Sequence, residues 1–340
     1  MAPKEGQQLQ IKETEFLFSS PSTIRGSIGK THFTVYLSEK KYFPSVLDSF
    51  KSRNRDNYLV LDEKSREYPD PVINFYINDN KTPFIELPNS TTAIVAGPLT
   101  NEDFVNQLPH ICYALSEKYR QETLGQISIH ASAVERDGQG VLILGDKGSG
   151  KTNFLIALCK NHEYNFVGND LVVIGAKDKL SLVFGNHQIN VRTGTTKELL
   201  PDIFNRYNLD DDGISNCYEK KASLYPAELN INCCLKETPL LKIVRINLHN
   251  SNPEFRQTRV LSPMRESLRL NEALARYIRG QTTPLMLSST GEIEGYFPSF
   301  DNSELCSFRN NTVYKMLHDT DFSYVSGFDP LMVAKRFSIL

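Results

Sequence analysis

Apolar and polar positions alternate along residues 26–100 in short runs, each bounded by Pro, Asn, Asp or Gly. A period of two residues is typical of β-strands, and these boundary residues are typical of turns. The pattern predicts strands at residues 31–37, 57–62, 71–79 and 91–97. The preceding residues 1–20 are polar and lack periodicity, so we expect a flexible N-terminus there.

The spacing of apolar residues changes at Asn101, a residue type that caps helices. Apolar residues then recur every three to four positions, which predicts a helix up to about Arg120. We therefore expect residues 21–122 to form a small, strand-rich α+β domain. The helix leads into a second domain, which we expect at residues 123–340.

The second domain begins with another alternating run. Residues 127–134 predict one strand, with His130 on the polar face opposite Ile127 and Ile129. Predicted strands and helices then follow one another, which indicates an α/β core with a mixed sheet and flanking helices. The further strands are predicted at residues 141–144, 165–168, 171–175, 179–185, 187–192 and 242–249, and the helices at 153–161, 198–207, 267–279 and 329–337.

Residues 145–152 match the Walker A pattern G-x-x-x-x-G-K-[ST] in full. In this pattern the glycines let backbone N–H groups face phosphate oxygens, the Lys supplies a cation and the hydroxyl binds Mg²⁺. A predicted strand enters the loop and a predicted helix leaves it, and helix N-termini favour anions. We expect a P-loop that binds ATP and Mg²⁺. Its phosphate-binding residues are Gly145, Asp146, Lys147, Gly148, Ser149, Gly150, Lys151, Thr152 and Asn153.

A metal bound at Thr152 also needs a carboxylate, normally one at the end of a nearby strand. Asp170 follows Thr152 by 18 residues and stands between two apolar runs. Asp170 is therefore the candidate second ligand of Mg²⁺. The alternative is a turn residue that interrupts a long strand.

The stretch from His130 through the loop to Asp170 resembles the HPr kinase/phosphorylase family, whose P-loop core looks like that of the phosphoenolpyruvate carboxykinases. The likeness covers about residues 127–175 and rests on a His before the loop and the run FVGND after it. It implies a kinase core of that type. It also implies that His130 lies beside the reacting phosphoryl group, that Lys151 and Thr152 contact phosphate and Mg²⁺, and that Asp170 helps to hold the metal.

Two positions depart from the family pattern. The family's catalytic acid, which takes the proton from the acceptor serine, corresponds to Asn169, and a downstream metal-binding Glu corresponds to Asn190. An amide cannot accept a proton at neutral pH, so the general base is either His130 or Asp170. Arg192 is a candidate contact to phosphate or substrate, with a surface ion pair as the alternative. We expect neither phosphorylase activity nor recognition of the HPr protein.

The predicted function is an ATP-dependent kinase that transfers the γ-phosphoryl group to a hydroxyl, on a small metabolite or on a Ser or Thr of a peptide or protein. The alternative is a nucleotide-gated binding or regulatory protein that holds ATP without transferring phosphate. Asn169 and Asn190 support that alternative. The identity of the acceptor and the preference for ATP or GTP stay open.

Arginine recurs along the helix predicted at residues 267–279. We interpret this series as a solvated face. The alternative is a basic stripe for a nucleotide or an anionic substrate. The series consists of Arg265, Arg269, Arg276 and Arg279.

The composition limits the partners of the chain. Its 38 basic and 40 acidic side chains give a net charge of −2, so no overall field attracts nucleic acid or an anionic membrane. No apolar run approaches the roughly 20 residues of a membrane span, and the N-terminus lacks a signal-peptide pattern. The six Cys contain no C-x-x-C, which indicates reduced thiols. We expect a cytoplasmic protein and leave a homo-oligomer open.

Overall fold

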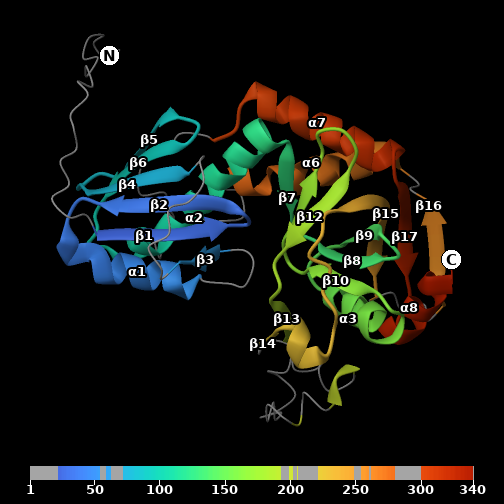
Figure 1. The fold of residues 1–340 in the computed structure, drawn as a ribbon. Helices are drawn as coiled ribbons and strands as arrows, with labels where there is room; N and C mark the ends of the chain where they lie inside the picture. The colour runs from blue at the N-terminus through green and yellow to red at the C-terminus, as the bar shows by residue number, and fades with distance from the viewer. Residues whose placement is uncertain are drawn as a thin grey trace.

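The computed structural model describes residues 22–53, 59–62, 72–192, 199–201, 205, 221–248, 254–259, 262–279 and 300–339. The predicted flexible N-terminus and most of the helix predicted at 198–207 lie outside this part of the chain. Within it, the protein is a mixed α/β structure built around two large sheets, which lie side by side (Figure 1).

The first sheet has six strands in the order β3-β1-β2-β4-β6-β5. β1 and β2 form an antiparallel hairpin, whose turn residues Gly29 and Lys30 have φ of 51° and 67°. Positive φ at both positions is what a two-residue type I′ turn requires. β2, β4 and β6 run parallel to one another. The strands are β1 (Ser22–Ile28), β2 (Thr31–Leu37), β3 (Leu59–Leu61), β4 (Ile73–Asp79), β5 (Phe84–Asn89) and β6 (Thr92–Gly97).

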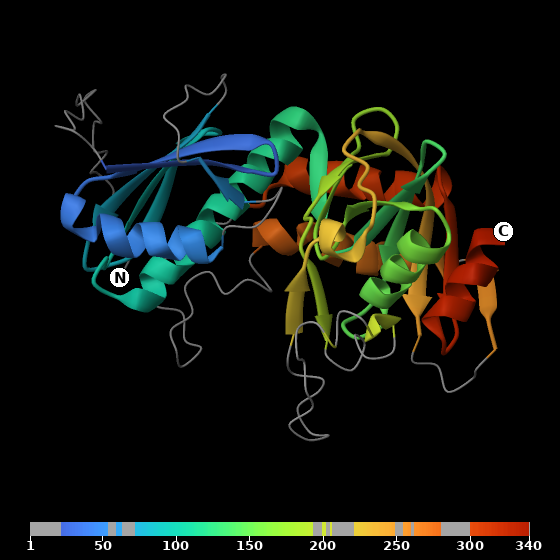
Figure 2. The same ribbon diagram turned by 60° about the horizontal axis from the view of Figure 1, so that its bottom comes forward.

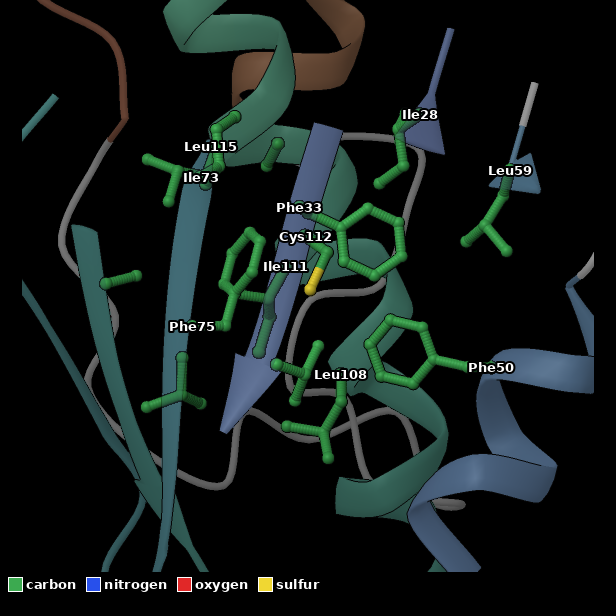
Figure 3. Packing of buried hydrophobic residues seen from close by; sticks show 14 of the residues in the cluster. Ile28, Phe33, Phe50, Leu59, Ile73, Phe75, Leu108, Ile111, Cys112 and Leu115 are labelled. Atoms are coloured by element: carbon green, nitrogen blue, oxygen red, sulfur yellow. The ribbon is translucent and has the colours of Figure 1, made fainter. Parts of the chain in front are cut away.

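Two helices, α1 (Phe43–Ser52) and α2 (Glu102–Tyr119), cover one face of this sheet. The side chain of Asn101 accepts a hydrogen bond from the backbone N of Phe104, which confirms the predicted cap of α2. Figure 3 shows side chains of both helices, such as Phe50 and Leu108, packed against strand residues. The alternating strands thus bury their apolar face under two amphipathic helices.

The second sheet has nine strands, with β10-β8-β9-β15-β12-β11-β7 along its main path and β17 and β16 beside β15. β15 runs parallel to β9 and to β17, whereas the other pairs are antiparallel, so the sheet is mixed. A separate pair is formed by β13 and β14. The strands are β7 (Gln126–Ile129), β8 (Ser132–Arg136), β9 (Gln139–Leu144), β10 (Asn165–Gly168), β11 (Val172–Gly175), β12 (Ser181–Gly185), β13 (Ile189–Arg192), β14 (Lys221–Leu224), β15 (Thr238–Asn247), β16 (Arg256–Arg259) and β17 (Asp321–Ser326).

Helices cover both faces of the second sheet (Figure 1). On β9, Ile143 packs with Phe154 of α3 (Lys151–Asn161) and Phe337 of α8 (Pro330–Ile339). The neighbouring Leu142 faces the other way, toward Leu270 of α6 (Pro263–Arg279) and toward α7 (Ser303–His318). Successive strand residues point to opposite faces, so each strand of this three-layer unit serves two cores.

The single strand predicted at residues 127–134 is wrong. The chain forms β7 and β8 instead, interrupted at His130 and Ala131, and the two strands have different partners. β7 pairs with β11, whereas β8 pairs with β9 and β10. Alternation of apolar and polar residues is the same for one long strand and for two short ones, so it could not reveal this change of partner.

A buried ionic network joins α2 to both sheets. Glu117 and Arg120 are fully buried and form an ion pair with an N–O distance of 2.9 Å. Arg120 also donates to the carbonyl of Ile28, at the end of β1, and Glu117 accepts from the backbone N and the hydroxyl of Ser128 in β7. Figure 2 shows α2 running from the first sheet toward β7. The network therefore fixes the junction between the two sheets.

Candidate functional site

The loop between β9 and α3, residues 145–150, is called the glycine loop here. Ser149 O accepts from the backbone N of Leu248, just after β15, and a Cβ added at Gly150 would lie 2.6 Å from the Leu248 side chain. Gly148 and Gly150 have φ of 83° and 91°, a conformation that L side chains rarely adopt. The sequence thus shapes a tight loop pressed against the end of the neighbouring parallel strand.

Lys151, the first residue of α3, is buried, with 8% of its surface exposed. Its Nζ donates to the backbone O of Gly145 at 2.8 Å and of Asp146 at 3.1 Å. Among the described residues no carboxylate lies within ion-pair distance of this nitrogen. The amine therefore spans the loop, and it has no paired carboxylate in the part of the chain that the structure describes.

Asn169 holds the hydroxyls of two neighbouring elements. Its Oδ1 accepts from Ser132 Oγ in β8 at 2.8 Å and from Thr152 Oγ1 in α3 at 3.3 Å. Asn169 is fully buried, and its Nδ2 has no hydrogen-bond partner among the residues that the structure describes. The same holds for the buried Ser149 Oγ in the glycine loop. Unsatisfied buried polar atoms are rare in folded proteins, and a ligand that supplies the missing partners is one explanation.

His130 and Asp170 are joined through the backbone. His130 Nδ1 lies 2.7 Å from the carbonyl O of Asp170. Because a carbonyl only accepts, Nδ1 carries the hydrogen, and Nε2 of the neutral ring keeps its lone pair. Asp170 has φ of 63° and accepts a 2.9 Å hydrogen bond from Asn190 Nδ2 at its Oδ2. Ser223 of β14 donates in turn to Asn190 Oδ1 at 2.9 Å.

Electrostatic effects link these groups. Burial and then the positive charge of Lys151 lower the pKa of His130, while Asp170 acts in the opposite direction. Burial also lowers the pKa of Lys151, against the charges of Asp170 and Asp146. The lowered pKa keeps the His130 imidazole neutral at pH 7, since its ordinary value is already near 6.5.

Two arginines that we did not predict as site residues also act on this cluster. Arg245, near the end of β15, and Arg276 of α6 both lower the pKa of Lys151, and Arg276 lowers that of His130 as well. Arg245 pairs with the buried Glu266, which accepts a 2.5 Å hydrogen bond from Tyr324. The sequence signal for Arg276 was its place in the arginine series of α6, which we interpreted as a solvated face.

Most of the predicted site residues lie close together. They come from the segment after β7, the glycine loop, α3 and the turn after β10. Asp146, Lys147 and Gly148 lie on the exposed side of the loop. The backbone of Arg192 ends β13, paired with Lys221, and its side chain lies outside the described part of the chain. Asn153 lies in the first turn of α3. Ser132 was not predicted, although it shared the polar face assigned to His130.

The donors near the loop suit a hard cation. Thr152 and Asp170 offer oxygen atoms, and Mg²⁺ is typically bound by one or two protein oxygens together with phosphate and water. Asn169 Oδ1 accepts the hydrogen of Thr152, which leaves the hydroxyl lone pairs free for a metal. Asp170 uses Oδ2 for Asn190, and Oδ1 makes no described hydrogen bond. The residues present therefore fit one Mg²⁺ bound with a phosphate.

Fold and site together define a mixed α/β protein with a glycine loop, a buried lysine and a histidine between β7 and β8. No family model matches the chain, and no curated protein matches it. Among solved structures, it is similar to the Hpr(Ser) kinase/phosphatase from Coxiella burnetii, at 17% identity over 39% of this chain and 78% of that chain. The TM-score of 0.24 is too low to carry an argument.

None of the helices in the described part of the chain is long and apolar enough to cross a membrane.

Proposed function

We propose that this protein binds ATP with Mg²⁺ at the glycine loop and transfers the γ-phosphoryl group to a hydroxyl of a small molecule, peptide or protein. The observation that carries the proposal is the convergence of Lys151, Asp170 and His130 at a loop that matches the Walker A pattern. A buried amine without a paired carboxylate is suited to anionic oxygens. Thr152 and Asp170 would hold Mg²⁺, whose chemistry when bound is to neutralise phosphate charge.

His130 is the favoured general base. Its Nδ1 donates to the carbonyl of Asp170, so Nε2 of the neutral ring can take the proton of the acceptor hydroxyl. The hydroxyl oxygen then forms a bond to the γ-phosphorus as the bond from that phosphorus to the ADP oxygen breaks. Asp170 is less suited to the base role, because its carboxylate already accepts from Asn190 and is the proposed metal ligand.

Asn169 takes a positioning role in this proposal. It cannot accept the proton, but it orients Thr152 and Ser132 through a single oxygen. Phosphoryl transfer depends mainly on positioning and charge stabilisation, so an amide here is compatible with catalysis.

Incubation of the protein with γ-labelled ATP, Mg²⁺ and an extract of its source tests the proposal. We expect label in a new product that is absent when Lys151→Ala replaces the wild-type protein. ATP binding without labelled product or ADP release would contradict the kinase proposal and would favour the alternative of a nucleotide-gated regulator.

A further inference from the structure

α6 carries an arginine stripe along the edge of the site. Arg269 and Arg276 are seven residues apart, which places them on the same face of the helix. Both are half-buried, whereas Arg265, further toward the N-terminal end of the stripe, is exposed. Arg265 thus fits the interpretation as a solvated face, whereas Arg269 and Arg276 are only partly exposed, and the side chain of Arg279 lies outside the described part of the chain.

α6 lies beside the strand that leads to the reacting groups. The helix packs on β7, with Leu270 and Leu274 against Ile127 and Ile129, and β7 leads directly to His130. Within the described ranges, Arg276 Nε is buried without a hydrogen-bond partner and the residue pairs with no carboxylate. The positive charge of Arg276 also lowers the pKa of both His130 and Lys151.

We infer that Arg276 contacts the γ-phosphoryl oxygens of bound ATP. This inference rests on the proposed function. A guanidinium that has no paired carboxylate in the described part of the chain, and whose charge acts on both the proposed base and the lysine, is suited to the negative charge on the transferred group. Arg245 is less suited to this role, because Glu266 neutralises it.

The contact makes Arg276 a residue that distinguishes triphosphate from diphosphate. Only ATP carries the phosphoryl group that Arg276 would contact, so loss of the side chain should weaken ATP binding and spare ADP binding. A residue that merely supports the fold would weaken the binding of both nucleotides equally.

Calorimetry tests this inference by measuring the dissociation constants of Mg-ATP and Mg-ADP. The proteins compared are wild type, Arg276→Ala, Arg276→Lys and the control Arg265→Ala. Arg265 lies on the same stripe, about 16 Å away along the helix axis at 1.5 Å per residue. We expect Arg276→Ala to weaken ATP binding about tenfold or more and ADP binding less than about twofold, since hydrogen bonds to charged groups are among the strongest. Arg276→Lys should be intermediate, because it keeps the charge but not the planar fork.

Equal loss of both nucleotides, or no loss of either, in a variant with a wild-type circular dichroism spectrum and melting temperature would overturn the inference. Unchanged ATP binding together with a raised KM for the hydroxyl acceptor would also overturn it. That result would mean that Arg276 contacts the acceptor rather than ATP. If wild type binds neither nucleotide, the proposed function fails rather than this inference alone.

Discussion

His130 is a histidine whose tautomer is set by a backbone carbonyl. The 2.7 Å contact from Nδ1 to the carbonyl of Asp170 orients the ring, and burial with the charge of Lys151 keeps it neutral. His130→Ala should lower ATP turnover about 10²- to 10⁴-fold, the usual contribution of a general base, and leave ATP affinity nearly unchanged. Turnover and binding measured on the same preparation check this. Equal losses of both would show that His130 is structural.

The pH dependence of turnover follows from the same side chain. The pKa of His130 is lowered, so the ring protonates only below its ordinary value of about 6.5. The base form is therefore present at pH 7, and kcat/KM should fall as the pH drops through a midpoint below 6.5. A profile of kcat/KM against pH measures this midpoint. The same acid limb in His130→Ala would assign the titration to another group.

Asn169 is predicted to act through Thr152 rather than on the substrate. Asn169→Ala removes the acceptor of the Thr152 and Ser132 hydroxyls, so Thr152 loses its fixed orientation toward the metal. We expect a higher Mg²⁺ concentration for half-maximal turnover, with nucleotide binding in EDTA unchanged. The Mg²⁺ titration of Asn165→Ala, which removes an amide of β10 that donates to Glu135 rather than touching Thr152 or Ser132, is the control. An unchanged Mg²⁺ requirement in Asn169→Ala would remove this positioning role.

At the scale of elements, the glycine loop depends on two glycines for different reasons. Gly148 and Gly150 have similar positive φ, but only a Cβ at Gly150 would meet another side chain, that of Leu248. Gly148→Ala should cost about 1–2 kcal/mol from backbone conformation alone. Gly150→Ala should cost about 1–3 kcal/mol more, because the loop must move away from β15. Urea unfolding of both variants measures the difference, and equal losses would show that Leu248 does not constrain the loop.

The sequence predicted best those elements whose bounds depend on neighbouring residues. β2 and β10 match their predicted bounds, and α2 begins at its predicted cap, because alternation and capping are properties of neighbouring residues. α1 and α7 were not predicted, and both lie between elements whose periodicity was clearer. The break between β7 and β8 depends on distant partners, since Glu117 holds Ser128 and Asp170 holds His130.

The site residues also differ in whether a local sequence pattern could predict them. The loop residues and Lys151 follow from a contiguous pattern, which the sequence contains in full. Arg276, in contrast, lies 125 residues after Lys151 along the chain and reaches the site only because α6 packs on β7. The arginine series left a basic stripe for a nucleotide as an alternative, but no local pattern could show that α6 packs on β7.

At the scale of the whole molecule, the Glu117–Arg120 pair connects the two sheets. Glu117→Ala would leave the Arg120 guanidinium buried without its anion, which typically costs about 3–5 kcal/mol. Glu39→Ala, in a solvent-exposed pair with Lys41, is the control and should change stability little. Chemical denaturation followed by circular dichroism measures both, since the chain has no Trp. A Glu117→Ala protein as stable as wild type would show that the junction is held by its apolar core alone.

The central claim is that the glycine loop binds a triphosphate through Lys151. The most direct measurement is the dissociation constant of Mg-ATP for wild type, Lys151→Ala and Lys147→Ala. Lys147→Ala removes an exposed side chain and keeps the backbone N–H that this loop position offers to phosphate. We predict saturable binding by wild type and by Lys147→Ala, and its loss in a folded Lys151→Ala protein. No binding by wild type, or equal binding by wild type and Lys151→Ala, would contradict the claim.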